Sequence, residues 1–231
     1  MRSSSTAQRS PAEPRALREL KAIRAFIAPL SPPVTSFEAS IRSTPFRILV
    51  SVLLSARTQD AVTEKAAARL FAAADTPGKM ARLSKARIAR LIYPVGFFRT
   101  KAKHILGICQ ALERTGCFPS TLDGLLGLPG IGRKSANLVL ALAFSKPAIA
   151  VDTHVFRISR RLGWAKGRTP ADVEKELEEL FPRRRWADVN QVLVGFGQTV
   201  CRPTHPKCGM CVLIQTCPSS SFPLAEGGQR G

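Results

Sequence analysis

The sequence lacks any uninterrupted apolar run of the about 18 residues that a membrane-spanning helix needs, so we expect no membrane association. Its first residues, Met1 to Pro14, are rich in Ser and Arg and contain no apolar stretch. This composition argues against a secretory signal peptide and predicts a short disordered basic tail over 1–14. A second disordered tail is expected over 218–231.

Acidic residues are scarce. The chain has 16 Asp and Glu against 35 Lys and Arg, which gives a formal net charge of +19 over 231 residues. So much positive charge repels itself, and a polyanionic partner is the natural interpretation. The alternative is a chain from an organism whose proteins are generally basic.

Hairpin turn signals, low-complexity linkers and fixed-period repeats are also missing, which argues against a β-sheet protein and a repeat array. Helical periodicity is present instead, beginning with Leu17, Leu20, Ile23 and Ile27. Two segments, Pro45–Ala56 and Asn137–Phe144, are apolar nearly all round and predict buried central helices. Amphipathic helices are expected over 61–74, 84–94 and 101–113, and Asp152, Asp172 and Asp188 lie where further helices can start. The sequence predicts an all-α fold with two helical lobes, one built on the two buried helices and one that holds the cysteines.

Cysteine is uneven in the chain. Two of the six, Cys109 and Cys117, are scattered and are expected to be core or surface thiols, whereas the others follow the spacing Cys-x6-Cys-x2-Cys-x5-Cys at Cys201, Cys208, Cys211 and Cys217. In a chain without an export signal such a cluster suggests a metal site rather than disulfides. The spacing alone leaves open whether the four thiolates hold a 4Fe-4S cluster or a zinc ion.

The segment Leu128 to Asn137 reads LPGIGRKSAN and lies between a short helical stretch and a buried helix. Gly130 and Gly132 permit unusual backbone angles and a close approach of a ligand to the main chain, while Ile131 can dip into the core. Amides at the start of the following helix then form an anion site that binds phosphate without reading base sequence. An ordinary helix–helix connection is the alternative.

Lys134 falls in the first turn after these glycines, and Asp152 opens the later segment VDTH. A lysine is a nucleophile only when neutral, and the helix N-terminus, Arg133 and partial burial disfavour its ammonium form before DNA binds. From position alone, the alternative is that Lys134 contacts a phosphate and Asp152 caps a helix.

From about Pro45 to Cys217 these motifs resemble the endonuclease III family of helix-hairpin-helix DNA glycosylases. The resemblance implies a six-helix barrel domain with the hairpin at 37–146 and an iron-sulfur domain made of 15–36 and 147–217. DNA would bind in the cleft between the two lobes. It also implies that the four clustered cysteines hold a 4Fe-4S cluster with a largely structural, DNA-positioning role.

The same resemblance implies a reaction. In this family the hairpin lysine, here Lys134, attacks C1′ of a damaged nucleotide as the base leaves, the VDTH aspartate, here Asp152, assists, and β-elimination cuts the strand. Adenine-mismatch glycosylases carry Ser at this lysine position, so Lys134 favours the bifunctional branch that acts on oxidised pyrimidines. The competing hypotheses are a non-enzymatic hairpin DNA-binding module and a glycosylase without lyase activity.

Partners and further contact residues follow from the resemblance. We expect a monomer that binds double-stranded DNA containing damaged bases or abasic sites and is located in the cytoplasm, with the nucleoid if the source is bacterial. The expected DNA contacts are Arg57, Gln59, Phe97, Gly130, Gly132, Arg133, His154, Arg202 and Lys207. His154 could instead be a core contact, and Asp60 is expected to cap a helix rather than to act in catalysis.

The residues expected to fill the space of a flipped nucleotide depart from the family pattern. Arg57 replaces a Gln in LLSARTQD, and Phe97 occupies the wedge position of VGFFRTK. Arg57 can hydrogen-bond an orphan base and favours the acceptors of guanine, while Phe97 can stack between bases. The alternative for Phe97 and Phe98 is a pair of buried loop anchors. These departures affect lesion range and opposite-base preference rather than the reaction.

Overall fold

A computed structural model describes residues 13–41 and 43–220 and confirms the all-α prediction for that part of the chain. No helix within those ranges is long and apolar enough to cross a membrane. Most of both expected tails lies outside the described residues. The helices are α1 Arg15–Ile27, η1 Ala28–Leu30, α2 Pro33–Ile41, α3 Pro45–Ser55, α4 Asp60–Ala73, α5 Pro77–Ala81, α6 Lys85–Ile92, α7 Phe98–Thr115, α8 Leu122–Leu126, α9 Arg133–Phe144, α10 Thr153–Arg161, α11 Pro170–Leu180, η2 Arg183–Arg185, α12 Trp186–Thr199 and η3 Cys208–Met210.

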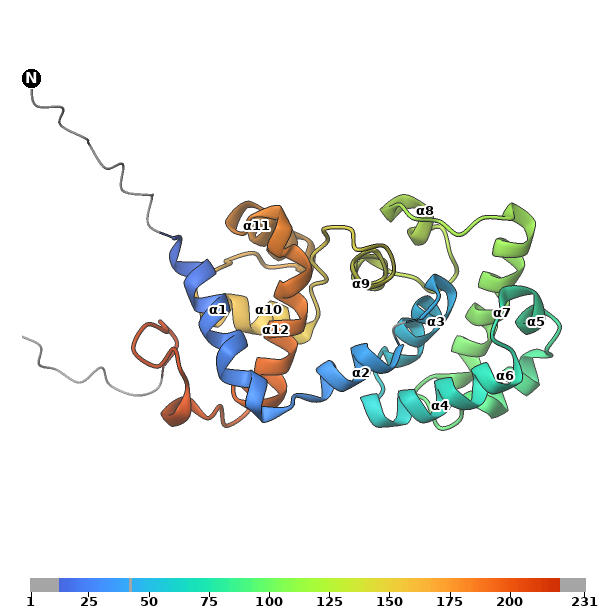
Figure 1. The fold of residues 1–231 in the computed structure, drawn as a ribbon, viewed down its shortest axis with the longest axis horizontal. Coiled ribbons are helices and arrows are strands. Elements are labelled where there is room, and N and C mark those ends of the chain that lie inside the picture. Colours follow the sequence, from blue (N-terminus) through green and yellow to red (C-terminus); the bar gives the residue numbers. More distant parts are fainter. Residues whose placement is uncertain (1–12, 42, 221–231) are drawn as a thin grey trace, which may run out of the picture.

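The helices form two lobes around two separate hydrophobic clusters (Figure 1). The first cluster takes side chains from α2 to α9, and the second takes them from α1 together with α10 to α12. The extended segment before α10 passes between the clusters: Ala148 and Ala150 belong to the first, Ile149 and Val151 to the second. Successive side chains of an extended chain point in opposite directions, so this one segment joins both cores and leads directly to Asp152.

Helix α3 is the centre of the first lobe, as its apolar sequence predicts. Thr44 caps its N-terminus by accepting a hydrogen bond from the Arg47 amide at 3.3 Å, and Pro45 occupies the first turn, where no amide donor is needed. The helix packs against α4 and α9, and Leu49, Val50 and Leu54 are fully buried. Burial on every side explains why the segment lacks an amphipathic pattern.

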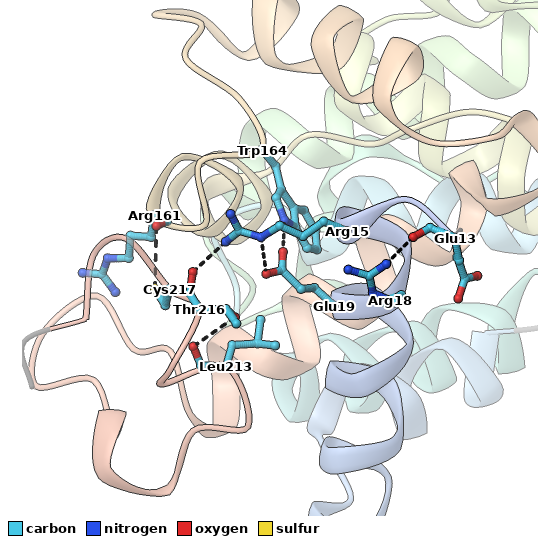
Figure 2. A network of polar contacts seen from close by, with 9 residues as sticks. All are labelled: Glu13, Arg15, Arg18, Glu19, Arg161, Trp164, Leu213, Thr216 and Cys217. Carbon is cyan, nitrogen blue, oxygen red and sulfur yellow. Dashed lines mark hydrogen bonds and ion pairs between the residues drawn. The ribbon is translucent and has the colours of Figure 1, made fainter. Parts of the chain in front are cut away.

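The second lobe joins the two ends of the chain. Helix α1 packs against α12, and Arg15 at its start donates to the Thr216 carbonyl at 2.6 Å and to Glu19 Oε1 at 2.8 Å (Figure 2). Trp164 Nε1 donates to the other Glu19 oxygen at 2.7 Å, which satisfies a carboxylate that is almost wholly buried. This network holds the last cysteine segment against the first helix.

Helix starts show one refinement of the sequence predictions. Asp152 is the N-cap of α10, whereas Asp172 is the third residue of α11, where it closes a capping box with Thr169. Asp188 likewise lies in the first turn of α12 rather than at its cap. Two residues of the predicted tail lie within the described ranges: Pro14 is the N-cap residue of α1, and Glu13 pairs with Lys21 at 2.5 Å.

Candidate functional site

A pocket of about 740 Å³ lies between the lobes. Its walls come from α2, the α3–α4 loop, α9, the start of α10 and α12. Both proposed catalytic residues line it, together with the predicted contacts Arg57, Gln59 and His154. The pocket therefore brings together side chains that are far apart in the sequence, in the cleft where the DNA site is expected. Its volume suits a ligand of the size of a nucleotide.

Lys134 reaches this pocket from the start of α9. Gly132 is the N-cap of the helix, so Lys134 is its second residue and its side chain is half-buried. Within residues 13–41 and 43–220 the structure gives the Lys134 ammonium no hydrogen-bond or ion-pair partner. An amine without a carboxylate partner is free to meet an incoming sugar carbon or phosphate.

The turn before α9 has the predicted hairpin form. Gly130 has φ of 75°, and a Cβ at this position would lie 2.1 Å from His104 Nδ1. Any other residue here would therefore have both a strained backbone and a steric clash with His104. A Cβ on Gly132, by contrast, would meet nothing within 4 Å. Ile131 is buried in the first cluster, as expected, and fixes the turn. The Gly132 side of the turn is therefore open to a phosphate at the helix N-terminus.

Two buried asparagines, neither of them predicted as a site residue, hold the extended segment that leads to Asp152. Asn137 Nδ2 donates to the Ile149 carbonyl at 2.9 Å, and Asn190 Nδ2 donates to the Ala150 carbonyl at 2.7 Å. They satisfy carbonyls of the extended segment in place of a neighbouring strand. Because Asn137 lies one turn after Lys134 on α9, the helix that presents the lysine also positions the segment that presents the carboxylate. A polar residue at the head of the apolar run NLVLALAF was the available sequence signal.

The structure contradicts the prediction that Asp60 caps a helix. The N-cap of α4 is Gln59, without a side-chain cap, and Asp60 Oδ2 instead accepts a hydrogen bond from Gln198 of α12 at 3.3 Å. Burial raises the pKa of Asp60, and the hydrogen bond from Gln198 and the charge of Lys134 partly oppose that rise. Asp60 is therefore a further carboxyl in the pocket, beside Asp152, and a polar link between the lobes.

His154 lies half-buried in the same pocket. Burial lowers the pKa of its imidazole, and the Arg157 guanidinium is 3.2 Å from Nδ1. Because a guanidinium only donates, Nδ1 is the acceptor and the neutral ring carries its proton on Nε2. His154 thus offers a neutral donor to the pocket, and its contact with DNA stays a prediction.

Arg57 and Phe97, the two predicted wedge residues, lie together. The Arg57 guanidinium stands 5.2 Å from the centre of the Phe97 ring, and both residues have left-handed backbones, with φ of 55° and 57°. Phe97 is 61% exposed, so the buried-anchor alternative is wrong for it; Phe98 packs against the core instead. Large side chains held outward by strained backbones suit insertion into a base stack.

A buried lysine joins the loop that carries Arg57 to the loop that carries Phe97. Lys101 of α7 is 5% exposed, and its Nζ donates to the Leu54 carbonyl at 2.7 Å and the Ala56 carbonyl at 2.6 Å. The same Nζ lies 3.3 Å from Thr58 Oγ1, and this hydroxyl oxygen accepts a hydrogen bond from the Gly96 amide at 3.1 Å. The lysine therefore satisfies two carbonyls at the C-terminal end of α3, those of Leu54 and the cap residue Ala56, and fixes the Arg57 loop against the Phe97 loop. No pattern in the sequence marked it.

Replacement of Lys101 by Met tests this tie. Loss of the donor leaves buried carbonyls unsatisfied, and we expect the free energy of unfolding at pH 7 to fall by about 1–3 kcal/mol. Burial also lowers the pKa of Lys101 to about 8 from 10.5, so between those values the unfolded state binds more protons. The parent should accordingly gain stability relative to the variant as pH rises through that window.

Urea unfolding between pH 7 and 10.5 measures both effects, with Lys65→Met, at an exposed position of α4, as the control. Equal stability of the parent and both variants at every pH would contradict the role given to Lys101.

Arg133 of the hairpin spans the lobes. Its guanidinium bonds both carboxylate oxygens of Glu174 on α11, at 2.9 to 3.1 Å, and Glu174 is 4% exposed. This two-pronged pair uses donors on Nε and Nη2 of a guanidinium that was predicted to contact DNA. Half of the Arg133 side chain is still exposed, and its contact with phosphate stays a prediction.

The four clustered cysteines line one cavity of about 270 Å³. All four are free, and none of the His, Cys, Asp and Glu side chains in the described ranges form a group of three that could hold a single metal ion. One amide and one guanidinium face two of the sulfurs: Leu213 N lies 3.4 Å from Cys211 Sγ, and Arg161 Nη1 lies 3.5 Å from Cys201 Sγ. Four cysteine sulfurs around a shared cavity, with N–H donors aimed at two of them, fit a multi-atom iron-sulfur group better than one zinc ion.

The loop between the first two of these cysteines presents exposed cations. Arg202 and Lys207 are exposed, and Arg161 of α10 holds the backbone between them by donating to the Arg202 carbonyl at 2.7 Å and the Pro203 carbonyl at 3.0 Å. The helix that Asp152 caps therefore also anchors this loop. The predicted phosphate contacts of Arg202 and Lys207 are sterically open.

Comparison with known proteins identifies the family. The family described as HhH-GPD superfamily base excision DNA repair protein matches residues 50–183. Endonuclease III of Thermotoga maritima is 46% identical over 175 residues, which cover 75% of this chain and 82% of that protein. The chain belongs to the endonuclease III family. Endonuclease III-like protein 1 of Mus musculus is 42% identical over 187 residues, or 79% of this chain and 62% of that relative.

Solved structures agree with this membership. A trapped endonuclease III–DNA covalent intermediate superimposes with a TM-score of 0.80 at 32% identity, over 91% of this chain and 98% of that chain. A non-covalent endonuclease III–DNA complex gives a TM-score of 0.74 at 33% identity, over 87% and 96%. Membership of the family makes the chain a DNA-binding base-excision repair enzyme of the glycosylase and abasic-site lyase class.

Proposed function

We propose that the chain is a bifunctional DNA glycosylase and abasic-site lyase that removes oxidised pyrimidines from duplex DNA. The observation that carries the proposal is the shared pocket of Lys134 and Asp152, in which the lysine has no carboxylate partner among the described residues. A lysine at the mouth of a phosphate-binding hairpin is placed to react with the sugar of a bound nucleotide. The same pocket holds the flipped nucleotide.

The proposed reaction begins at the neutral amine. Lys134 Nζ forms a bond to C1′ while the bond from C1′ to the base breaks, and the departing base keeps the electron pair and takes up a proton. Positive charge develops on the sugar in this step, and the Asp152 carboxylate offsets it. The attached nitrogen then loses one of its protons, the bond from C1′ to O4′ breaks as the sugar ring opens, and O4′ takes up a proton. The product is a protonated Schiff base that keeps one N–H.

Strand cleavage follows from the Schiff base. The positively charged imine acidifies the C2′ hydrogens, so that removal of one proton expels the 3′ phosphate oxygen from C3′. Water then hydrolyses the imine and frees Lys134. The protein residues in the pocket hold the sugar and exclude bulk water during these steps.

The products of a labelled duplex test this assignment. A duplex with one thymine glycol should lose the base and be cut on its 3′ side without added alkali, at the same rate as base release. Base release with an intact strand would contradict the lyase step and support a glycosylase without lyase activity. If the protein binds the duplex but neither releases the base nor cuts the strand, the result would contradict the proposed enzyme and support a non-enzymatic DNA-binding module.

We also propose that Cys201, Cys208, Cys211 and Cys217 hold a 4Fe-4S cluster. Four thiolates supply the ligand set that such a cluster needs, and their shared cavity and N–H···S contacts support it. The bound cluster supplies no reaction step here; it cross-links 201–217 and so fixes Arg202 and Lys207 for phosphate binding. The chain is proposed to act as a monomer in the cytoplasm.

Anaerobically purified protein should therefore absorb broadly near about 400 nm. Cys211→Ala should lose this absorbance, lower the melting temperature and weaken DNA binding, because the loop loses its cross-link. Cys117→Ser, at an exposed thiol outside the cavity, should retain all three properties. Colourless protein with bound zinc, or normal absorbance in Cys211→Ala, would contradict the assignment.

A further inference from the structure

A second groove, separate from the interlobe pocket, lies between α6 and α7. It has a volume of about 680 Å³ and is lined by Lys85 and Arg90 of α6 and by Arg99, Lys103 and His104 of α7, with no Asp or Glu. A basic face on a single helix is commonly just solvated. Here two helices turn cations into the same concave space, where their charges repel in the absence of an anion.

These cations are available to a ligand. Lys85, Arg90 and Lys103 are exposed, and none of them joins an ion pair with the residues that the structure describes. Arg99 lies over the Phe98 ring at 5.3 Å, which leaves its guanidinium edge free to donate. The chain elsewhere uses part of its few carboxylates to pair with arginine, for example Glu174 with Arg133. Within the groove no such partner exists.

The groove runs between the hairpin turn and the loop that carries Phe97, the two segments of the first lobe that are predicted to contact DNA. His104 at one end packs on Gly130 of the hairpin turn, and Phe98 at the other end follows the wedge residue Phe97. From Phe97 to His104 the helix rises by about 10 Å. One strand of duplex DNA carries a charge every 3.4 Å or so along its axis, so this length spans about three phosphates.

We propose that this groove binds phosphates of the DNA backbone next to the hairpin turn and so extends the DNA-binding face beyond the lesion pocket. The inference rests on the proposed action on duplex DNA and adds a contact that recognises no base. Arg90 and Lys103 face the groove from its two walls and would each neutralise one phosphate. They would raise affinity for damaged and undamaged duplexes alike.

The test compares two double variants that remove the same charge. Arg90→Gln with Lys103→Gln empties the groove of its central cations. Arg114→Gln with Arg184→Gln removes two exposed cations that line neither this groove nor the interlobe pocket, one near the far end of α7 and one in the other lobe. Binding to a duplex with a non-cleavable abasic analogue is measured by fluorescence anisotropy from low to high salt, and melting temperatures check the folding of both variants.

The groove variant should bind at least about tenfold more weakly at low salt, and its slope of log affinity against log salt should be less steep by about 1.8. The control variant should keep the parent slope within about half a unit, because its cations lie away from the DNA. If the parent binds DNA and the two double variants show the same slope of log affinity against log salt, the proposed groove is wrong and the proposed function is unaffected. A parent that binds no DNA would overturn the proposed function and the groove with it.

Discussion

Replacement of Lys134 by Gln is expected to slow cleavage of an abasic-site duplex by at least about 10³-fold while leaving its affinity for that duplex within about tenfold of the parent. Gln has nearly the length of Lys and suits a first helical turn, so α9 and the hairpin should be unchanged. It has no amine to attack C1′, and without the Schiff base the C2′ hydrogens are acidified only by the open-chain aldehyde, which is weaker in this respect than a protonated imine. Single-turnover cleavage and equilibrium binding measure the two effects separately.

Lys175→Gln is the control, because Lys175 is exposed on α11 and lines neither groove nor pocket. Cleavage by Lys134→Gln at the parent rate would mean that another amine is the nucleophile. A large loss of affinity together with normal single-turnover cleavage would instead assign Lys134 to phosphate binding.

Asp152 offers a pair of substitutions that separates two roles. Its Oδ1 accepts the Val155 amide at 2.8 Å and caps α10, and its carboxylate charge faces the pocket. Asp152→Asn keeps a good cap but removes the charge, so we expect base release to fall by about 10²–10⁴-fold with little change in melting temperature. Asp152→Ala should lose the same activity and, in addition, about 1 kcal/mol of stability.

Base release from a thymine glycol duplex, followed under single-turnover conditions, and thermal unfolding of the three proteins measure these differences. Normal base release by Asp152→Asn would show that the side chain serves only as a cap. Equal melting temperatures of Asp152→Asn and Asp152→Ala would contradict the cap instead.

The parts of the site that local sequence predicted are those whose function depends on local backbone. The hairpin follows from two glycines around an apolar residue before a helix, and the placement of Lys134 follows from the helix start. The four cysteines were visible for the same reason, since their ligand spacing lies within one short segment. The buried helices α3 and α9 were predicted because an apolar run of that length is longer than a typical strand and is most readily explained as a buried helix.

The contacts that complete the site join residues far apart in the chain, and the sequence did not predict them. Asp60 looks like any helix-start carboxylate until the fold places Gln198 beside it. Lys101 and Glu174 resemble ordinary surface charges, yet each is buried by a neighbouring element and holds two segments together. Phe97 and Phe98 are adjacent aromatics, and only the left-handed backbone at Phe97 decides which one is exposed.

The most direct test of the central claim is the site of covalent attachment. The parent protein, mixed with an abasic-site duplex and reduced with borohydride, should form a stable protein–DNA adduct, and mass spectrometry of its peptides should locate the sugar on Lys134. Absence of an adduct under conditions in which the protein binds the duplex, or attachment to a different residue, would contradict the account.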